Sequence, residues 1–230
     1  MFTTLHILFI GLTVITIPLL TRYITLGGHI RVEKWLKFLA VVIIFFDPIY
    51  WTWEWMTFGK FDFQYTLPLY LCSLFWLLMP FAIFLKRGTF KQIALANIAT
   101  VGLVSGIMGF VFNYHLDTWG VISFVGLRSL LYHYLMIFGA YLIWKSGYYK
   151  PEAGDQWRAF VPVWIILFFG IILNILYGYD YGYTAGGQGT PFTILSNVLP
   201  IPIFLVLLYS LFFLVSWLIF YRKLPLSKGN

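Results

Sequence analysis

The chain has 230 residues, of which 61% are hydrophobic, 22% aromatic and only 10% charged, and its mean hydropathy is +0.86. Soluble domains contain about 45–50% apolar and about 25% charged residues, so this composition excludes a disordered chain, a collagen-like repeat, a nucleic-acid-binding protein and a water-soluble enzyme. The net charge of +7 is therefore expected to mark the cytoplasmic loops of a membrane protein rather than an anionic partner.

Long apolar segments follow one another along the whole chain. A bilayer core about 30 Å thick needs roughly 20 apolar residues per helix, and the segments that meet this length are 4–20, 36–57, 67–85, 92–112, 129–146, 159–178 and 194–221. Glycines and charged residues separate them, as expected of connections between helices. The sequence predicts an all-α, polytopic membrane bundle of about seven transmembrane helices that forms a single domain over residues 1–230.

The basic residues are distributed unevenly between the two sides of this bundle. All except Lys60 and Arg128 fall on one side, namely Arg22, Arg31, Lys34, Lys37, Lys86, Arg87, Lys91, Lys145, Lys150, Arg158, Arg222, Lys223 and Lys228. Because Lys and Arg concentrate in cytoplasmic loops, we expect the N-terminus outside and the C-terminus in the cytoplasm of a multi-pass cell-membrane protein.

Polar residues within the spans lie mainly in the expected outer half. Helical spacing places them on three faces, formed by Asp47, Tyr50, Trp51 and Glu54 on span two, by Ser129, Tyr132, His133 and Met136 on span five, and by Gly170, Asn174 and Tyr177 on span six. Since such residues are costly in lipid unless they face a partner or water, we predict an outward-facing polar pocket. Asn174 is equally consistent with interhelical hydrogen bonding, and the Tyr/Gly-rich loop at 177–183 with either a lid or a plain interfacial loop.

Two residues in the expected outer half, one thiol and one imidazole, could carry out acyl chemistry. Acyl transfer or hydrolysis needs a nucleophile and a nearby base, and Cys72 and His133 are the candidates. The alternative is an inert cysteine in the helix packing. Arg128 could bind a lipid phosphate or a carboxylate, or anchor its helix at the interface. The four histidines lack metal-binding spacing, and no nucleotide motif is present, so neither a metal nor another cofactor is expected.

Several segments resemble a known family. Residues 67–74, Leu-Pro-Leu-Tyr-Leu-Cys-Ser-Leu, are similar to the Leu-Pro-Leu-His-Leu-Cys signature of the YwaF-type bacterial integral membrane proteins, which are related to the eukaryotic transmembrane protein 164. Arg128-Ser129 with His133, and Asn174 followed by Asp180-Tyr181 and by Ser196 before Pro200, resemble its later motifs. The resemblance implies a bacterial plasma-membrane protein and, from the eukaryotic branch, a phospholipid acyltransferase that uses Cys and His.

This chain departs from the family pattern at three places. Tyr70 stands where the family has His, and Asp180 replaces the Asn of an Asn-Tyr pair. The eukaryotic cysteine directly follows the proline, which corresponds to Leu69 here and not to Cys72.

The leading hypothesis is therefore a membrane protein that acts on lipid or acyl-bearing substrates, with His133 as the catalytic base and Cys72 or an activated water as the nucleophile. The expected substrate-binding residues are Glu54, Tyr70, Arg128, Asn174, Asp180 and Tyr181. The first alternative is a non-enzymatic protein that binds or transports a solute or lipid, and the second is a scaffold for a cell-envelope complex. Membrane lipids are the expected partners, together with a lipid or small-molecule ligand and no nucleic acid; the sequence does not indicate an oligomeric state.

Overall fold

The computed structural model describes residues 2–187 and 189–224, and this part of the chain is helical without any β-strand. The long helices are α1 (Thr4–Thr25), α2 (Gly28–Ile44), α3 (Phe46–Phe58), α5 (Ser73–Phe84), α6 (Thr89–Asn97), α7 (Leu103–Val111), α9 (Phe124–Lys145), α10 (Asp155–Tyr177) and α12 (Ile201–Phe220). Short helices α4 (Phe63–Thr66), α8 (Tyr114–Trp119) and α11 (Thr193–Ser196) lie in the connections. The predicted all-α membrane fold is confirmed.

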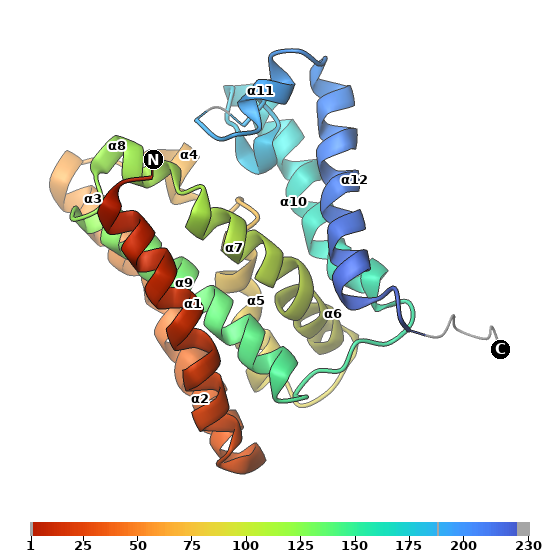
Figure 1. Ribbon diagram of the computed structural model, residues 1–230. Helices are drawn as coiled ribbons and strands as arrows, with labels where there is room; N and C mark the ends of the chain where they lie inside the picture. Colours follow the sequence, from red (N-terminus) through yellow and green to blue (C-terminus); the bar gives the residue numbers. More distant parts are fainter. Residues whose placement is uncertain (1, 188, 225–230) are drawn as a thin grey trace.

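Seven helical segments run through the bundle, because α2 continues into α3 and α6 into α7. Five of these segments are long and apolar enough to cross a membrane. Of the other two, α5 is shorter, and α9 is less apolar because it carries polar residues such as Arg128 and His133. Figure 1 shows α4, α8 and α11 at the same end of the bundle as the N-terminal end of α1, with the C-terminal end of α12 at the opposite end. This arrangement agrees with the predicted alternation of connections. Lys228, one of the residues used to assign orientation, lies outside the described residues.

Two predicted spans start later than expected, in both cases beside a proline. Residues 67–72 form irregular backbone, so α5 begins at Ser73 rather than at residue 67. Pro68 disfavours a helical conformation at Leu67, which has extended dihedral angles. Similarly, Pro200 separates the short α11 from α12, so the last span starts at Ile201 and not at residue 194.

Two other spans contain interruptions that the sequence pattern did not predict. The helix breaks at Phe45, between α2 and α3. The fourth span contains a π-helical stretch, Ile98–Gly102, between α6 and α7. Gly106 allows α7 to pack closely on α9, because an added Cβ there would lie 3.2 Å from both Met136 and Ile137.

The core of the bundle surrounds α9, which packs against α1, α2 and α7. At the end opposite α4 and α8, Asp155 anchors the start of α10. Its buried carboxylate accepts hydrogen bonds from the Tyr149 hydroxyl at 2.7 Å and from the Glu152 amide at 3.1 Å, and it pairs with Arg158. Asp155 therefore fixes the start of α10 at this end of the bundle.

Candidate functional site

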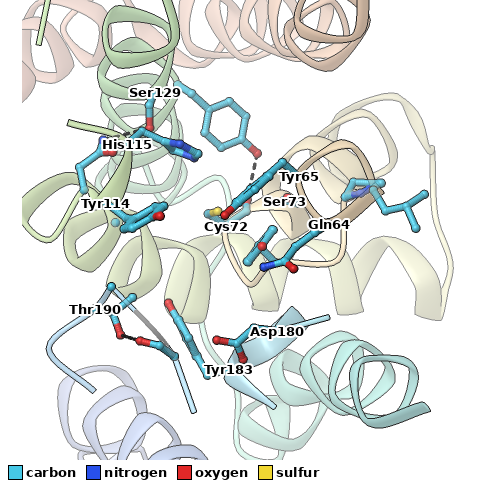
Figure 2. Close-up of a pocket in the computed structure, with 18 of the residues that line it drawn as sticks. Gln64, Tyr65, Cys72, Ser73, Tyr114, His115, Ser129, Asp180, Tyr183 and Thr190 are labelled. Atoms are coloured by element: carbon cyan, nitrogen blue, oxygen red, sulfur yellow. Dashed lines mark hydrogen bonds between the residues drawn. The ribbon is translucent and has the colours of Figure 1, made fainter. Parts of the chain in front are cut away.

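A cavity of about 480 Å³ lies at the end of the bundle that carries α4 and α8. Its walls come from α3, the segment 64–73, the α7–α8 connection, α9 and the loop residues 178–187, 189 and 190. In Figure 2 Cys72 lies near the centre of the group, with Tyr114 and His115 on one side and Asp180 and Tyr183 below. Cys72 and His133, predicted as catalytic residues, line this same cavity, together with Tyr70, Arg128 and Asp180 from the predicted binding set.

Cys72 is the last residue of the irregular segment and immediately precedes α5. Its thiol is not part of a disulfide and lines the cavity. The Tyr132 hydroxyl donates a hydrogen bond to the Cys72 carbonyl at 2.9 Å and accepts one from the Trp76 amide at 3.2 Å. Tyr132 thereby fixes the start of α5 to α9, the helix that carries His133.

His133 has a defined tautomer. Its Nδ1 lies 2.8 Å from the Ser129 carbonyl oxygen, and because a carbonyl can only accept, Nδ1 must carry the proton. In the neutral ring Nε2 then carries the lone pair, as a general base requires. Gly109 leaves space for this ring, since a Cβ on Gly109 would lie 2.3 Å from Nε2.

Buried polar groups support α9 beside this histidine. The Ser129 hydroxyl and the Asn113 side-chain amide, both buried, are joined by contacts of 2.9 and 3.1 Å. Asn113 directly precedes α8, so this pair ties the α7–α8 connection to α9. All four residues of the face predicted on span five, Ser129, Tyr132, His133 and Met136, are buried.

Arg128 forms an ion pair with Asp47, a pairing that the sequence did not predict. The two side chains are 18% and 14% exposed. Arg128 Nε also donates to the Phe46 carbonyl at 3.2 Å, and the guanidinium carbon lies 4.6 Å from the centre of the Tyr50 ring. Arg128 therefore joins α9 to the start of α3 while it also lines the cavity.

The loop between α10 and α11 contributes Asp180 to the cavity and packs Tyr181 inward. The Ala185 amide donates to Asp180 Oδ1 at 2.6 Å. Tyr181 is fully buried, donates its hydroxyl proton to the Phe63 carbonyl, and packs edge-to-face on Tyr70 at 5.4 Å between ring centres. Tyr181, predicted to bind substrate, thus lies behind the wall of the cavity.

The face predicted on span six does not join the other two. Gly170 is buried against the carbonyl of Tyr181, but Tyr177 is 65% exposed. Asn174 donates to the Tyr179 carbonyl at 3.2 Å and lines a separate, mainly apolar groove of about 820 Å³ between α10 and α12. The face on span six does not line the cavity, because the backbone of the loop 178–187 packs against α10 at Gly170.

Glu54, another predicted binding residue, lines a second cavity of about 320 Å³. Tyr65, Tyr114 and His115 line both cavities and so form a shared wall. Burial and the neighbouring Tyr114 raise the pKa of Tyr65 to about 12, so its hydroxyl remains a proton donor near neutral pH. His115 was considered in the sequence only as a metal ligand, and its position between the cavities depends on contacts with distant segments that spacing does not encode.

The fold and the cavities define a multi-pass helical membrane protein with a polar site at one end of the bundle. The sequence model of the TMEM164 family matches residues 1–221, and the chain belongs to this family. No curated protein matches the chain, and no solved structure does.

Proposed function

We propose that this protein catalyses acyl transfer or hydrolysis on a lipid or other acyl-bearing substrate in the larger cavity. The observation that carries the proposal is that Cys72 and His133 line one cavity while the Ser129 carbonyl holds the His133 tautomer with a lone pair on Nε2. A thiol and a base that share a cavity are the minimum requirement for nucleophilic catalysis. The resemblance to YwaF-type proteins supports a bacterial plasma membrane as the location.

The proposed chemistry has two steps. In the first, His133 Nε2 takes the Cys72 proton, the sulfur attacks the acyl carbonyl, and the alcohol leaves with the proton from the imidazolium, which produces a thioester. In the second, His133 removes a proton from an acceptor alcohol or from water, whose oxygen attacks the thioester and releases the thiol, which regains its proton. An alcohol acceptor gives transfer and water gives hydrolysis.

The remaining polar groups of the larger cavity would hold the substrate. Arg128 retains N–H groups beyond those bound to Asp47 and Phe46, so its guanidinium could also bind a lipid phosphate. Tyr70 and Asp180 line the same space and would contact the remainder of the substrate.

The test is acyl release or transfer from a radiolabelled phospholipid by the purified full chain in nanodiscs. We expect Cys72→Ala and His133→Gln each to lower the rate at least ~100-fold, since a positioned acid–base group contributes typically 10²–10⁴-fold, and we expect an acyl mass adduct on Cys72 in the wild type. His29→Gln is the matched control, because His29 stacks on Tyr148 and lies outside the cavity. Full activity in Cys72→Ala would exclude the thiol mechanism.

A second candidate function is non-enzymatic binding or transport of a lipid or solute. It is favoured by the cavity beside Glu54, whose lining contains no thiol. In the same experiments this function predicts ligand binding without acyl release or an adduct in the wild type, and no effect of Cys72→Ala on binding.

A further inference from the structure

Glu54 is a buried carboxylate without a protein counter-ion. Glu54 is 3% exposed, yet its carboxylate forms no ion pair with any Lys, Arg or His in the described part of the chain. The nearby Arg128 is paired with Asp47. Buried charges in proteins are normally paired, so this carboxylate is available to pair with a cationic ligand.

Glu54 is held in place by hydrogen bonds rather than by a cation. The Asp62 amide donates to Oε1 at 3.2 Å, and the Thr66 hydroxyl lies 2.7 Å from Oε2. These contacts close the connection between α3 and α4 over the carboxylate. Each carboxylate oxygen can accept more than one hydrogen bond, so acceptor capacity remains on the side that faces the second cavity.

The rest of this cavity has the character of a site for an organic cation. Aromatic side chains form much of its lining, contributed by Tyr50, Phe58, Tyr65, Tyr114 and Trp119, and Asp62 adds a second carboxylate. Aromatic faces attract ammonium groups, and aromatic cages recognise methylated ammonium ligands. Lys60 also lines the cavity, and its positive charge would repel a bound ammonium group. The described residues form no cluster of three or more His, Cys, Asp or Glu side chains that could hold a metal ion.

We propose that the second cavity binds an organic ammonium group, with Glu54 as its counter-ion and the surrounding aromatic rings as its walls. The ammonium group can belong to a free amine or to the headgroup of a lipid. The site is separate from the Cys72–His133 cavity across the wall of Tyr65, Tyr114 and His115, so ammonium binding does not depend on acyl chemistry.

The experiment measures choline binding to the full chain by isothermal titration in a neutral maltoside detergent. Its uncharged isostere, 3,3-dimethylbutan-1-ol, tests whether the positive charge is required. We expect choline to bind and the isostere to bind at least tenfold more weakly. Sodium chloride at the same ionic strength should not displace choline.

Glu54→Gln is the decisive variant because glutamine preserves the local hydrogen bonds. Its carbonyl can accept from the Asp62 amide, and its amide can donate to the Thr66 oxygen, whose own proton can go to the Asp62 carbonyl 2.7 Å away. We expect choline affinity to fall at least tenfold in Glu54→Gln and to rise several-fold in Lys60→Gln. Glu152→Gln, on the exposed surface at the opposite end, is the matched control and should bind as the wild type does, as should Cys72→Ala.

Nanodiscs distinguish the two sources of the ammonium group. Weaker apparent choline affinity in phosphatidylethanolamine bilayers than in phosphatidylglycerol bilayers identifies a lipid headgroup as the occupant, whereas equal affinity identifies a free amine. The proposal is overturned if choline does not bind, if the isostere binds equally well, or if Glu54→Gln leaves the affinity unchanged. Failure of the acyltransferase assay alone does not affect it.

Discussion

At the scale of single residues, the tightest steric requirement at the site is that of the His133 ring against Gly109. Ser129 fixes one edge of the imidazole, and the other edge lies against the glycine. The sequence indicated His133 as a candidate base, but it offered Gly109 only as a small residue on an apolar helix. The need for glycine becomes visible once the two helices are packed together.

Gly109→Ala tests this requirement. Because the new Cβ would lie 2.3 Å from His133 Nε2, the ring must move, and we expect a loss of about 1–3 kcal/mol in unfolding free energy, as is usual for overpacking, together with loss of the proposed activity. Gly11→Ala is the control, because an added Cβ there meets nothing within 4 Å; it should be neutral or stabilising, since alanine is the better helix former. Reversible unfolding in mixed micelles measures both, and equal stabilities of the two variants would contradict the prediction.

At the scale of secondary-structure elements, the Asp47–Arg128 pair joins α3 to α9. In the sequence, Asp47 appears as a residue next to a proline and Arg128 as an interfacial cation, and nothing in their spacing of 81 positions indicates that they meet. The pair places a charged contact beside the break at Phe45, where α2 gives way to α3. It therefore supports the region in which the helix is interrupted.

A double-mutant cycle tests this role. Arg128→Ala should cost roughly 3 kcal/mol in unfolding free energy, because removing one partner leaves a largely buried carboxylate unpaired, and adding Asp47→Ala should recover part of that loss. The control pair is Lys37 with Glu33, which are 50% and 40% exposed and lie one turn apart on α2; Lys37→Ala should cause no measurable change, as is common for exposed ion pairs. Strictly additive losses at Arg128 and Asp47 would show that the pair does not couple the two helices.

The sequence predicted the helical elements better than their interruptions. Apolar length and charged connections located all seven segments, because a bilayer imposes both requirements on any span. The irregular backbone at 67–72 follows from Pro68, which disfavours a helical conformation at Leu67. The hydrogen bond from the Tyr132 hydroxyl to Cys72 and the π-helical stretch at Ile98–Gly102 are not visible in apolar length or charge. Non-helical backbone at membrane depth is tolerated where it lines a cavity, and the segment 67–72 does so.

At the scale of the whole molecule, the two cavities beside α4 and α8 lie at one end of the bundle and most basic residues at the other, while the apolar groove follows α10 and α12. The candidate site was predicted in part: Cys72 and His133 share a cavity, whereas Glu54 and Asn174 line separate ones. Periodicity places a side chain on a face of its own helix, but it does not show which connection packs over that face. On α10, the connection that packs over the predicted face is the loop 178–187.

The predicted orientation, with the N-terminus outside, is tested by cysteine labelling in the Cys72→Ala background. We expect Lys60→Cys to react with a membrane-impermeant maleimide in intact cells and Arg87→Cys to react only after permeabilisation, because the two positions lie in connections on opposite sides of the predicted topology. Mass shifts on gels report both reactions. The reverse pattern would invert the topology and place the cavities on the cytoplasmic side.

The shortness of α5 has a consequence for the surrounding lipid. With 12 residues and a rise of 1.5 Å per residue, α5 spans about 18 Å, well short of a hydrocarbon core about 30 Å thick. Over the remaining depth the irregular segment 67–72 lines the cavity. Such hydrophobic mismatch is relieved by local thinning of the bilayer. We therefore expect the bilayer beside α5 to be thinner and water to reach the depth of Cys72. At that depth water and Cys72 could contact a lipid that remains in the membrane.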